Sequence, residues 1–398
     1  MNNPTRKITI QGMLLQGAYW YGCCTYYAFF IATLIHHGWE GSAAAGAITA
    51  MTVITMLTQP ICGYISDKFL SEKKLSIILL AVAGASFLLM PLSLASGSKL
   101  IVLVNMVGAA LTASQVGGLL DAWIVGLKQE FPSINYGLIR GTGSFTFALS
   151  GQISGMMTIA YGHDMRLWIG GLAFVLSALI AMAFRPARRT HQSKEEGEEI
   201  RKLGGREAIT LVFSSKQYNL LLAVSFFLFL SSNTMLTLLQ LIIPEMGGTA
   251  AQIGTAVLVM AGSEVPMMFL MAFMIKKFGF KKIFAFCGVF YVIRMFITAF
   301  IGTVEGLIYI QVLQGLTYAV LLPVGMSYLS QILDERIRST AVTTYAAVTA
   351  ALTGILGNLF TSALLARGFS AHTALIFFAL SAFIGFLLIL YGVVRKIW

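Results

Sequence analysis

The most informative shortage in this 398-residue sequence is a shortage of charge. Only 11% of its residues are Asp, Glu, Lys or Arg, while 57% are hydrophobic. A soluble globular chain carries roughly 25% charged residues. Apolar runs of about 20 residues, the length that crosses a bilayer as a helix, recur along the whole chain. The sequence therefore predicts an all-α integral membrane protein without a separate soluble domain.

The sequence also lacks the short motifs of several common enzyme classes. It contains no HExxH, no GxSxG and no GxxxxGK[ST], and so offers no zinc-protease helix, no nucleophile elbow and no nucleotide-binding loop. Its four cysteines fall inside apolar runs without metal-ligand spacing, and we interpret them as small packing residues. We expect no enzyme activity, no catalytic residue, no metal and no cofactor.

The apolar runs divide the chain into twelve predicted membrane spans. A long polar loop over residues 186–216 separates six of these spans from the other six. We therefore predict an N-terminal six-helix bundle (1–185), a cytoplasmic linker loop (186–216) and a C-terminal six-helix bundle (217–398). The predicted spans are 9–35, 43–66, 75–95, 99–127, 135–161, 166–185, 217–243, 250–275, 283–303, 306–333, 339–365 and 372–394.

Lys and Arg are distributed very unevenly between the predicted loops. Of the 27 Lys and Arg residues, 22 lie on one side of the predicted membrane and two lie inside spans; three lie on the other side, namely Lys99, Arg166 and Arg367. An excess of Lys and Arg marks the cytoplasmic side. Both termini are therefore predicted to be cytoplasmic, and the net charge of +11 belongs to membrane-facing loops rather than to a nucleic-acid partner.

Four ionisable residues lie well inside the predicted spans: Asp121, Arg140, Glu264 and Arg294. A charge at the bilayer centre costs at least ~2.5–3.5 kcal/mol and is normally paired. Each half contributes one acid and one base on consecutive spans, so we expect Arg140 to pair with Asp121 and Arg294 with Glu264. These pairs are interpreted as facing a water-filled cavity; the alternative is that they hold helices together.

Further polar and aromatic residues recur at helical spacing and are candidates for contact with a small-molecule substrate. Arg140, Ser144 and Phe147 share one helical face, because residues three and four apart lie on the same side of a helix. For any single polar residue, a hydrogen bond between transmembrane helices is an equally good explanation. The other candidates are Tyr26, Asn233, Gln314 and Tyr318.

Two halves of six spans describe one recurrent transporter plan. The segment "GYISDKFLSEKK", with Gly63, Asp67 and Lys68, resembles the gating signature that follows the second helix in the major facilitator superfamily (MFS). The segments "NYGLIRGTGSFTFALSG", "GSEVP", "YVIRMF" and "LQGLTYAVLLP" resemble the branch of lactose permease, the oligosaccharide:proton symporters and the phenylpropionate permeases. The resemblance implies the twelve-helix MFS fold.

The resemblance also implies roles for three residues of the first half. Asp121 takes the place of the carboxylate of the fourth helix, and Arg140 the place of the guanidinium of the fifth helix, which together grip the substrate. Phe147 takes the place of the aromatic ring that stacks on a sugar.

In the second half, the resemblance implies that Glu264 links the substrate and proton sites and that Arg294 lies near the protonation site. The sugar symporters have a His and a Glu on the tenth helix where this chain has Gln314 and Thr317. A coupled proton would therefore have to be carried by Glu264 or Asp121.

Together these observations predict a secondary active transporter with alternating access. We expect proton-coupled import of a sugar, oligosaccharide or glycoside, driven by the proton gradient. Three alternatives stay open: a permease for an organic or aromatic acid, which two arginines can clamp, a nucleoside permease, and a drug or metabolite exporter. We expect a multi-pass protein of the inner cell membrane, monomeric by resemblance, with the lipid bilayer as its surroundings.

Overall fold

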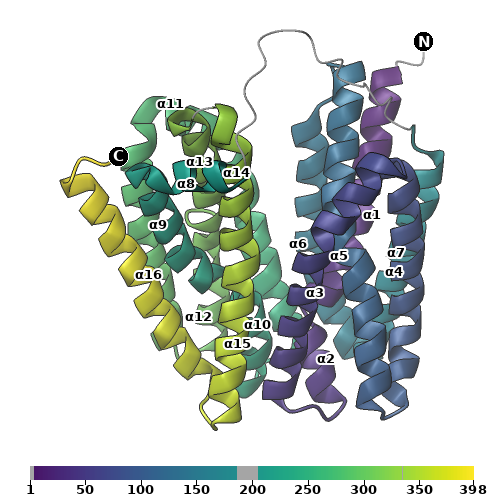
Figure 1. Cartoon of the computed structure of the whole chain (residues 1–398). Helices are drawn as coiled ribbons and strands as arrows, with labels where there is room; N and C mark the ends of the chain where they lie inside the picture. Colours follow the sequence, from purple (N-terminus) through teal and green to yellow (C-terminus); the bar gives the residue numbers. More distant parts are fainter. Residues whose placement is uncertain (1–3, 186–204, 334) are drawn as a thin grey trace. The chain divides into compact units, whose positions relative to one another are not determined.

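The computed structural model describes residues 4–185, 205–333 and 335–398, and every regular element in these residues is a helix (Figure 1). Within this described part, nine helices are long and apolar enough to cross a membrane. The predicted class, an all-α membrane protein, is confirmed. The count of twelve spans and the cytoplasmic position of the termini stay predictions.

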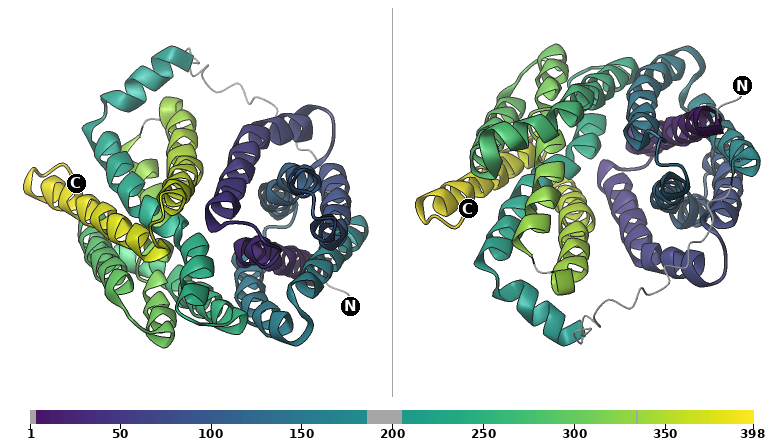
Figure 2. Two further views of the ribbon diagram at one scale, coloured as in Figure 1. Left: turned by 90° about the horizontal axis from the view of Figure 1, so that it is seen from below. Right: turned by 90° about the horizontal axis from the view of Figure 1, so that it is seen from above.

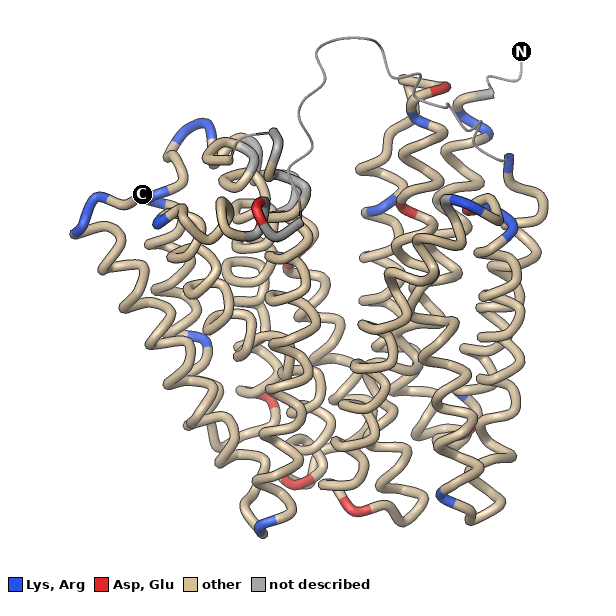
Figure 3. The backbone as a smooth tube through the Cα atoms, in the orientation of Figure 1, with Lys and Arg blue, Asp and Glu red and all other residues tan. Residues whose placement is uncertain are grey.

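The chain forms two compact units. Unit 1 comprises Met1–His191 together with Leu239–Gly262, and unit 2 comprises Gln192–Leu238 together with Ser263–Trp398. Figure 2 views each unit along its helices, which run side by side. In Figure 3, most Lys and Arg residues of each unit gather at the end that carries a chain terminus, and a few lie along the helices or at the opposite end.

Unit 1 is built from seven complete helices. Side chains close the starts of two of them: Ser71 accepts from the backbone N–H of Lys74, and Asn135 accepts from that of Leu138, as N-cap residues do. The helices are α1 (Pro4–Tyr27), α2 (Phe30–His36), α3 (Gly41–Lys68), α4 (Glu72–Ala95), α5 (Lys99–Glu130), α6 (Tyr136–Tyr161) and α7 (His163–Ala183).

The first part of a much longer helix, α11 (Ala250–Phe300), also packs in unit 1. It crosses α6 at glycines. A Cβ atom on Gly254 would lie 2.3 Å from the carbonyl oxygen of Gly151, and one on Gly155 would lie 2.5 Å from that of Ala250. Because only glycine lets the two backbones approach so closely, these positions explain why residues 250–262 group with unit 1.

Unit 2 contains the remaining helices. Residues 205–214 of the predicted linker form a helix, and residues 186–204 lie outside the described part. At Gly279 (φ 73°) α11 reverses, so that its second part is a separate span. The elements are α8 (Gly205–Ser214), α9 (Lys216–Asn233), α10 (Met235–Glu245, shared with unit 1), α12 (Val304–Tyr309), η1 (Ile310–Gln314), α13 (Tyr318–Ile332), α14 (Glu335–Ala346), η2 (Ala347–Leu352), α15 (Thr353–Ala366) and α16 (Ala371–Val394).

Four predicted spans are interrupted in ways that the hydrophobic pattern does not predict. The first span breaks between α1 and α2, and the seventh breaks between α9 and α10. The tenth contains the 3₁₀ segment η1, and the eleventh contains the π-helical segment η2. Such irregular turns inside helices frequently mark functional positions, and here they lie beside buried polar side chains.

Candidate functional site

Arg140 and Asp121 meet in unit 1, as predicted. Nε of Arg140, on α6, lies 3.7 Å from a carboxylate oxygen of Asp121, on α5. Each side chain is 34% exposed, so the ion pair is accessible from outside the helix core. An ion pair with this exposure contributes little to stability. The pair forms as predicted, and its role in binding substrate stays a prediction.

Two side chains of α1 extend this ion pair into a network. Gln16 is fully buried and donates its amide to Asp121 (2.9 Å), while its carbonyl accepts from the indole N–H of Trp20 (2.8 Å). The guanidinium of Arg140 lies over the Trp20 ring, 4.7 Å from its centroid, in a cation–π contact. We call Gln16, Trp20, Asp121 and Arg140 the unit 1 polar cluster.

The remaining predicted residues of α6 lie beside this cluster. The hydroxyl of Ser144 accepts from Nη1 of Arg140 at 3.3 Å. The ring of Phe147 meets the ring of Trp20 edge to face, with 6.1 Å between centroids. Both Ser144 and Phe147 are partly exposed. The cluster therefore presents charged hydrogen-bonding groups next to two aromatic rings, which is the combination that recognises a small polar solute.

Tyr26, the predicted substrate contact, and its neighbour Tyr27 differ in exposure. Tyr26 is 4% exposed and packs against Phe30 and Phe87, with its hydroxyl on the sulfur of Met51. Tyr27 is 40% exposed, and its hydroxyl lies 2.8 Å from that of Ser114. A contact between Tyr26 and substrate stays a prediction, and Tyr27 is the more accessible ring.

Arg294 is completely buried in unit 2 and is held by neutral acceptors. Its guanidinium donates to the carbonyl of Gln311 (2.7 Å), to the hydroxyl of Thr317 (3.2 Å) and to the carbonyl of Gln314. Gln311 and Gln314 lie in η1, and Thr317 is the N-cap residue of α13, three residues after η1 ends. Hydrogen bonds of this kind are the usual compensation for burying a charge. The 3₁₀ turn thus brings three hydrogen-bond acceptors to the guanidinium of Arg294.

Gln314 also connects Arg294 to the predicted acid. Its amide donates to a carboxylate oxygen of Glu264 at 3.0 Å, so the amide group bridges the base and the acid. The turn is held close to α11, because the N–H of Gly315 donates to the hydroxyl of Ser263 (3.0 Å) and a Cβ on Gly315 would lie 2.3 Å from the Ser263 carbonyl oxygen. We call Glu264, Gln314 and Arg294 the unit 2 relay.

The other predicted contacts of unit 2 mostly join helices. Asn233, at the end of α9, donates its amide to the carbonyl of Thr349 and to the hydroxyl of Thr353, both at 2.7 Å. These bonds connect the break after α9 to the π-helical segment, so the alternative of a bond between helices explains Asn233. Tyr318 is partly exposed and contacts the ring of Phe229 at 5.5 Å between centroids.

The predicted gating motif ends α3. Lys68 lies over the ring of Tyr64, 5.2 Å from its centroid. Gly63 is half-buried and has open space where a Cβ would be, while the side chain of Asp67 lies outside the described part. Lys73, just beyond, donates to the carbonyls at the end of α7. The gating role of the motif stays a prediction.

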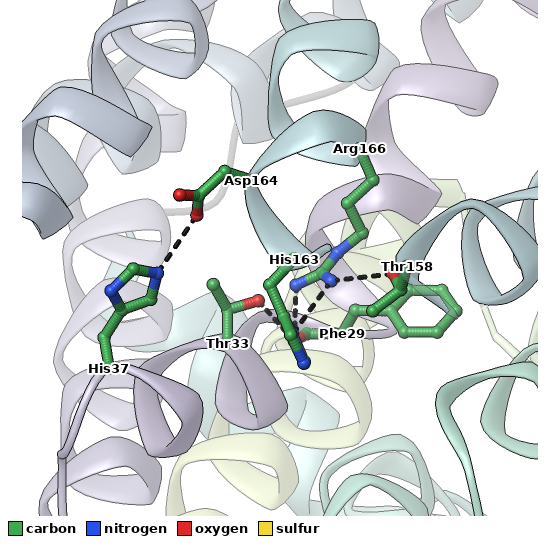
Figure 4. A network of polar contacts seen from close by, with 7 residues as sticks. All are labelled: Phe29, Thr33, His37, Thr158, His163, Asp164 and Arg166. Carbon is green, nitrogen blue, oxygen red and sulfur yellow. Dashed lines mark hydrogen bonds and ion pairs between the residues drawn. The ribbon is translucent and has the colours of Figure 1, made fainter. Parts of the chain in front are cut away.

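Arg166, predicted as the first residue of its span, is a buried residue of α7. The helix begins three residues earlier than predicted, at His163, and Arg166 is 1% exposed. It donates to the carbonyl of Phe29 (3.1 Å) and to the hydroxyl of Thr158 (3.1 Å) (Figure 4). It also donates to the carbonyl of Thr25 (3.4 Å). These carbonyls belong to the break between α1 and α2, so Arg166 satisfies acceptors that the interrupted helix leaves free.

The same region contains three of the five histidines. His163 lies 3.3 Å from Arg166 and its ring stacks on that of His36, with 4.2 Å between centroids. His37 contacts Asp164 at 3.0 Å (Figure 4). The sequence carries a signal for the start of α7. Asp164 lies in its first turn, and Asp and Glu are favourable near a helix N-terminus, which places the start of the helix before Arg166.

Comparison with known proteins identifies the family. The model of the MFS_1 like family matches residues 29–393. The maltose permease of Geobacillus stearothermophilus is 26% identical over 354 residues, which cover 88% of this chain and 86% of the permease. The uncharacterized transporter YwbF of Bacillus subtilis is 26% identical over 312 residues, covering 78% of this chain and 74% of that protein.

Solved transporters share the fold. A nucleoside transporter, NupG, superposes with a TM-score of 0.77 at 14% identity, covering 98% of this chain and 99% of that chain. A D-xylose–proton symporter superposes with a TM-score of 0.66 at 15% identity, covering 97% and 96%. The bacterial relatives and the membrane-spanning helices place the protein in the inner membrane as a multi-pass protein. The chain belongs to the MFS_1 like family and is a transporter of the major facilitator superfamily.

Proposed function

We propose that this transporter imports a sugar, oligosaccharide or glycoside together with a proton, by alternating access. The observation that carries the proposal is the partly exposed Asp121–Arg140 pair set beside the Trp20 ring. The similarity to a maltose permease over most of both chains supports the choice of a saccharide.

The unit 1 polar cluster suits a polyhydroxylated solute. Each sugar hydroxyl both donates and accepts, and the cluster offers carboxylate acceptors from Asp121 and guanidinium donors from Arg140. A hydrogen bond to a charged group is worth about 1.5–3 kcal/mol. Trp20 and Phe147 supply rings 6.1 Å apart, against which the apolar face of a sugar ring can pack. Arg140 and Asp121 are proposed to bind substrate, and Trp20 joins Phe147 as the aromatic wall.

The unit 2 relay is proposed to carry the proton. The Gln314 amide, whose carbonyl accepts from Arg294, donates to a carboxylate oxygen of Glu264, and a hydrogen bond of this kind stabilises the charged form of a carboxylate. A shift of the η1 turn that withdrew Gln314 would remove that support, and Glu264 would then take up a proton. Restoring the contact would release it. Asp121 is the second candidate, because its Gln16 contact and its ion pair with Arg140 give it an equivalent environment.

Two other cargoes, an organic or aromatic acid and a nucleoside, are tested by the same experiment. Arg140 is able to clamp a carboxylate, which would suit an aromatic or organic acid. The similarity to a nucleoside transporter concerns the fold alone. Export of a drug or metabolite would reverse the direction of transport rather than change the polar cluster.

A thermal-shift screen of the detergent-purified protein against sugars, glycosides, nucleosides and aromatic acids separates these cargoes, because a ligand that binds only the folded state raises its stability. We expect a neutral saccharide to raise the unfolding temperature, and Arg140→Ala and Phe147→Ala to abolish the rise. Phe145→Ala is the matched control, since Phe145 lies on the same helix and is 60% exposed. Stabilisation by carboxylates alone would overturn the proposal.

A further inference from the structure

The break between α1 and α2 is bridged by one side chain of α10. The backbone N–H of Ile31 donates to the side-chain oxygen of Gln240 at 2.9 Å, and the amide nitrogen of Gln240 donates to the backbone carbonyl of Tyr27 at 3.0 Å. Gln240 lies in the part of α10 that belongs to unit 1, and it is 2% exposed. Its amide is therefore enclosed by protein and bonded on both sides to the backbone of the first span.

The two backbone groups would be partners of each other in an uninterrupted helix. In an α-helix each N–H donates to the carbonyl four residues earlier, which for Ile31 is the carbonyl of Tyr27. The Gln240 amide stands between them, because it accepts from the N–H and donates to the carbonyl. A side chain that inserts into a helical hydrogen bond in this way is a recognised cause of a sharp kink. Gln240 thus replaces one helical bond with two bonds of its own.

The backbone also fixes which way the amide points. A backbone N–H only donates, and a backbone carbonyl only accepts. The oxygen of Gln240 must therefore face Ile31, and its nitrogen must face Tyr27. A reversed amide would set two donors against each other on one side and two acceptors on the other. Gln240 matches the break in polarity as well as in position.

The residues of the break do not themselves require a kink. Sharp kinks arise at Pro, at Gly/Ser pairs or where another group inserts into the helical hydrogen bonds. Residues 26–31 read Tyr-Tyr-Ala-Phe-Phe-Ile and contain no Pro, Gly or Ser. At the centre of the break Phe29 has φ −139°, outside the left-handed region. The inserted amide therefore accounts for the break, and the same residues are able to form a continuous helix.

Arg166, the other side chain at the break, is compatible with both shapes. The N–H of Phe29 donates to the carbonyl of Tyr26 at 3.2 Å, whereas a continuous helix would use the carbonyl of Thr25. The Thr25 carbonyl accepts from Arg166 at 3.4 Å. A carbonyl has two lone pairs, so Thr25 is able to accept from Arg166 and from Phe29 together. Gln240, in contrast, occupies the place of a helical bond.

We propose that Gln240 is a withdrawable link that sets the shape of the first span. While its amide is inserted, α1 and α2 stay separate. When it is withdrawn, the N–H of Ile31 bonds directly to the carbonyl of Tyr27 and the two helices join into one. Both shapes give each backbone group a partner, so neither shape leaves a buried backbone group unpaired. The break is thus an element with two discrete arrangements.

The position of Gln240 in the sequence connects this element to transport. Gln240 lies on the seventh predicted span, in the second half of the sequence, and the break lies on the first span, in the first half. Movement of one half against the other, as in the alternating access proposed above, would withdraw the amide. Gln240 is then a positioning residue, which acts through the α1 helix that carries Gln16 and Trp20 of the unit 1 polar cluster.

The test measures the distance across the break by double electron–electron resonance between spin labels. The full-length protein is reconstituted in lipid nanodiscs without substrate, so the result does not depend on the proposed cargo. The labels are placed at Leu14→Cys and Ile35→Cys, which are 57% and 39% exposed, in a Cys62→Ser background, because the other three native cysteines are buried. In one continuous helix these positions lie about 32 Å apart, and a kink shortens this distance.

Gln240→Leu removes the amide at similar volume, and we expect it to raise the ratio of the 32 Å population to the shorter one about fivefold or more over the wild type. Gln240→Asn keeps the amide but shortens the side chain by one methylene, so it no longer reaches both groups and should shift the ratio in the same direction. The control is Thr237→Val, which removes a buried hydroxyl from the same helix and should keep the wild-type distances.

A proline separates the two shapes further. Ile31 is the second residue of α2, where proline is tolerated in the separate helix, but in a continuous helix proline clashes with the carbonyl four residues earlier. In the double variant Gln240→Leu and Ile31→Pro, the 32 Å population should therefore disappear. Wild-type distances in folded Gln240→Leu or Gln240→Asn, or a 32 Å population that persists in the double variant, would overturn the proposal.

Discussion

Gln314 offers the sharpest perturbation of the unit 2 relay. Its carbonyl accepts from Arg294 and its amide donates to Glu264 at 3.0 Å, so Gln314→Leu removes two hydrogen bonds to charged groups, worth about 1.5–3 kcal/mol each. Arg294 is fully buried but keeps Gln311 and Thr317 as acceptors. We therefore expect the free energy of unfolding to fall by about 3 kcal/mol, the lower end of the sum of the two bonds.

The assay is thermal unfolding in detergent at one fixed scan rate, because irreversible unfolding makes the apparent midpoint depend on that rate. Gln314→Glu keeps an acceptor for Arg294 and should lose less stability than Gln314→Leu. The control is Val312→Ala, on the same 3₁₀ segment with a side chain that is 53% exposed, for which we expect a change within ~0.5 kcal/mol. If Gln314→Leu unfolds at the wild-type temperature, Gln314 does not link the base to the acid.

Three further outcomes follow from the structure of unit 1. Arg166→Leu strips the donor from two carbonyls at the break of the first span, so the free energy of unfolding should fall by about 2–4 kcal/mol in thermal unfolding; an unchanged midpoint would contradict this role. Gly155→Val introduces a Cβ only 2.5 Å from the carbonyl oxygen of Ala250, so the variant should unfold at a lower temperature. The control is Gly97→Val, whose Cβ would have no atom within 4 Å. Because Gly97 has φ 68°, this control measures the backbone strain of the substitution alone. Asp121→Asn keeps the shape but removes the charge beside Arg140, and in equilibrium binding should weaken saccharide affinity about tenfold or more; unaltered affinity would refute the binding role.

The all-helical class and the Asp121–Arg140 ion pair can be predicted from the sequence. The first depends on the length of the hydrophobic runs and the second on the cost of an isolated charge in a span. Membrane spans follow from hydrophobic length, and the cost of an isolated charge in a span predicts that Arg140 needs an acid nearby. Asp121, on the preceding span, was the nearest candidate, and the ion pair exists. Helical spacing likewise placed Ser144 and Phe147 on the face of Arg140.

The sequence does not show which neighbouring helix packs against a given face of a predicted helix. Trp20 lies four residues after Gln16, yet only tertiary packing brings its ring under Arg140. The burial of Arg166 depends on α7 beginning at His163, three residues before the predicted start of the span, and on its contact with the break between α1 and α2. The relay through Gln314 depends on a 3₁₀ turn held against Ser263 by the close approach of Gly315, and hydrophobic periodicity carries no signal for such a turn.

The central claim is that proton movement through Glu264 drives saccharide import. The direct measurement is uptake into proteoliposomes under an imposed inward proton gradient, compared with counterflow exchange, for Glu264→Gln and for Glu305→Gln, whose exposed carboxylate lies in the first turn of α12. We predict that Glu264→Gln loses gradient-driven accumulation but keeps counterflow, while Glu305→Gln keeps both. Full accumulation by Glu264→Gln would contradict the account.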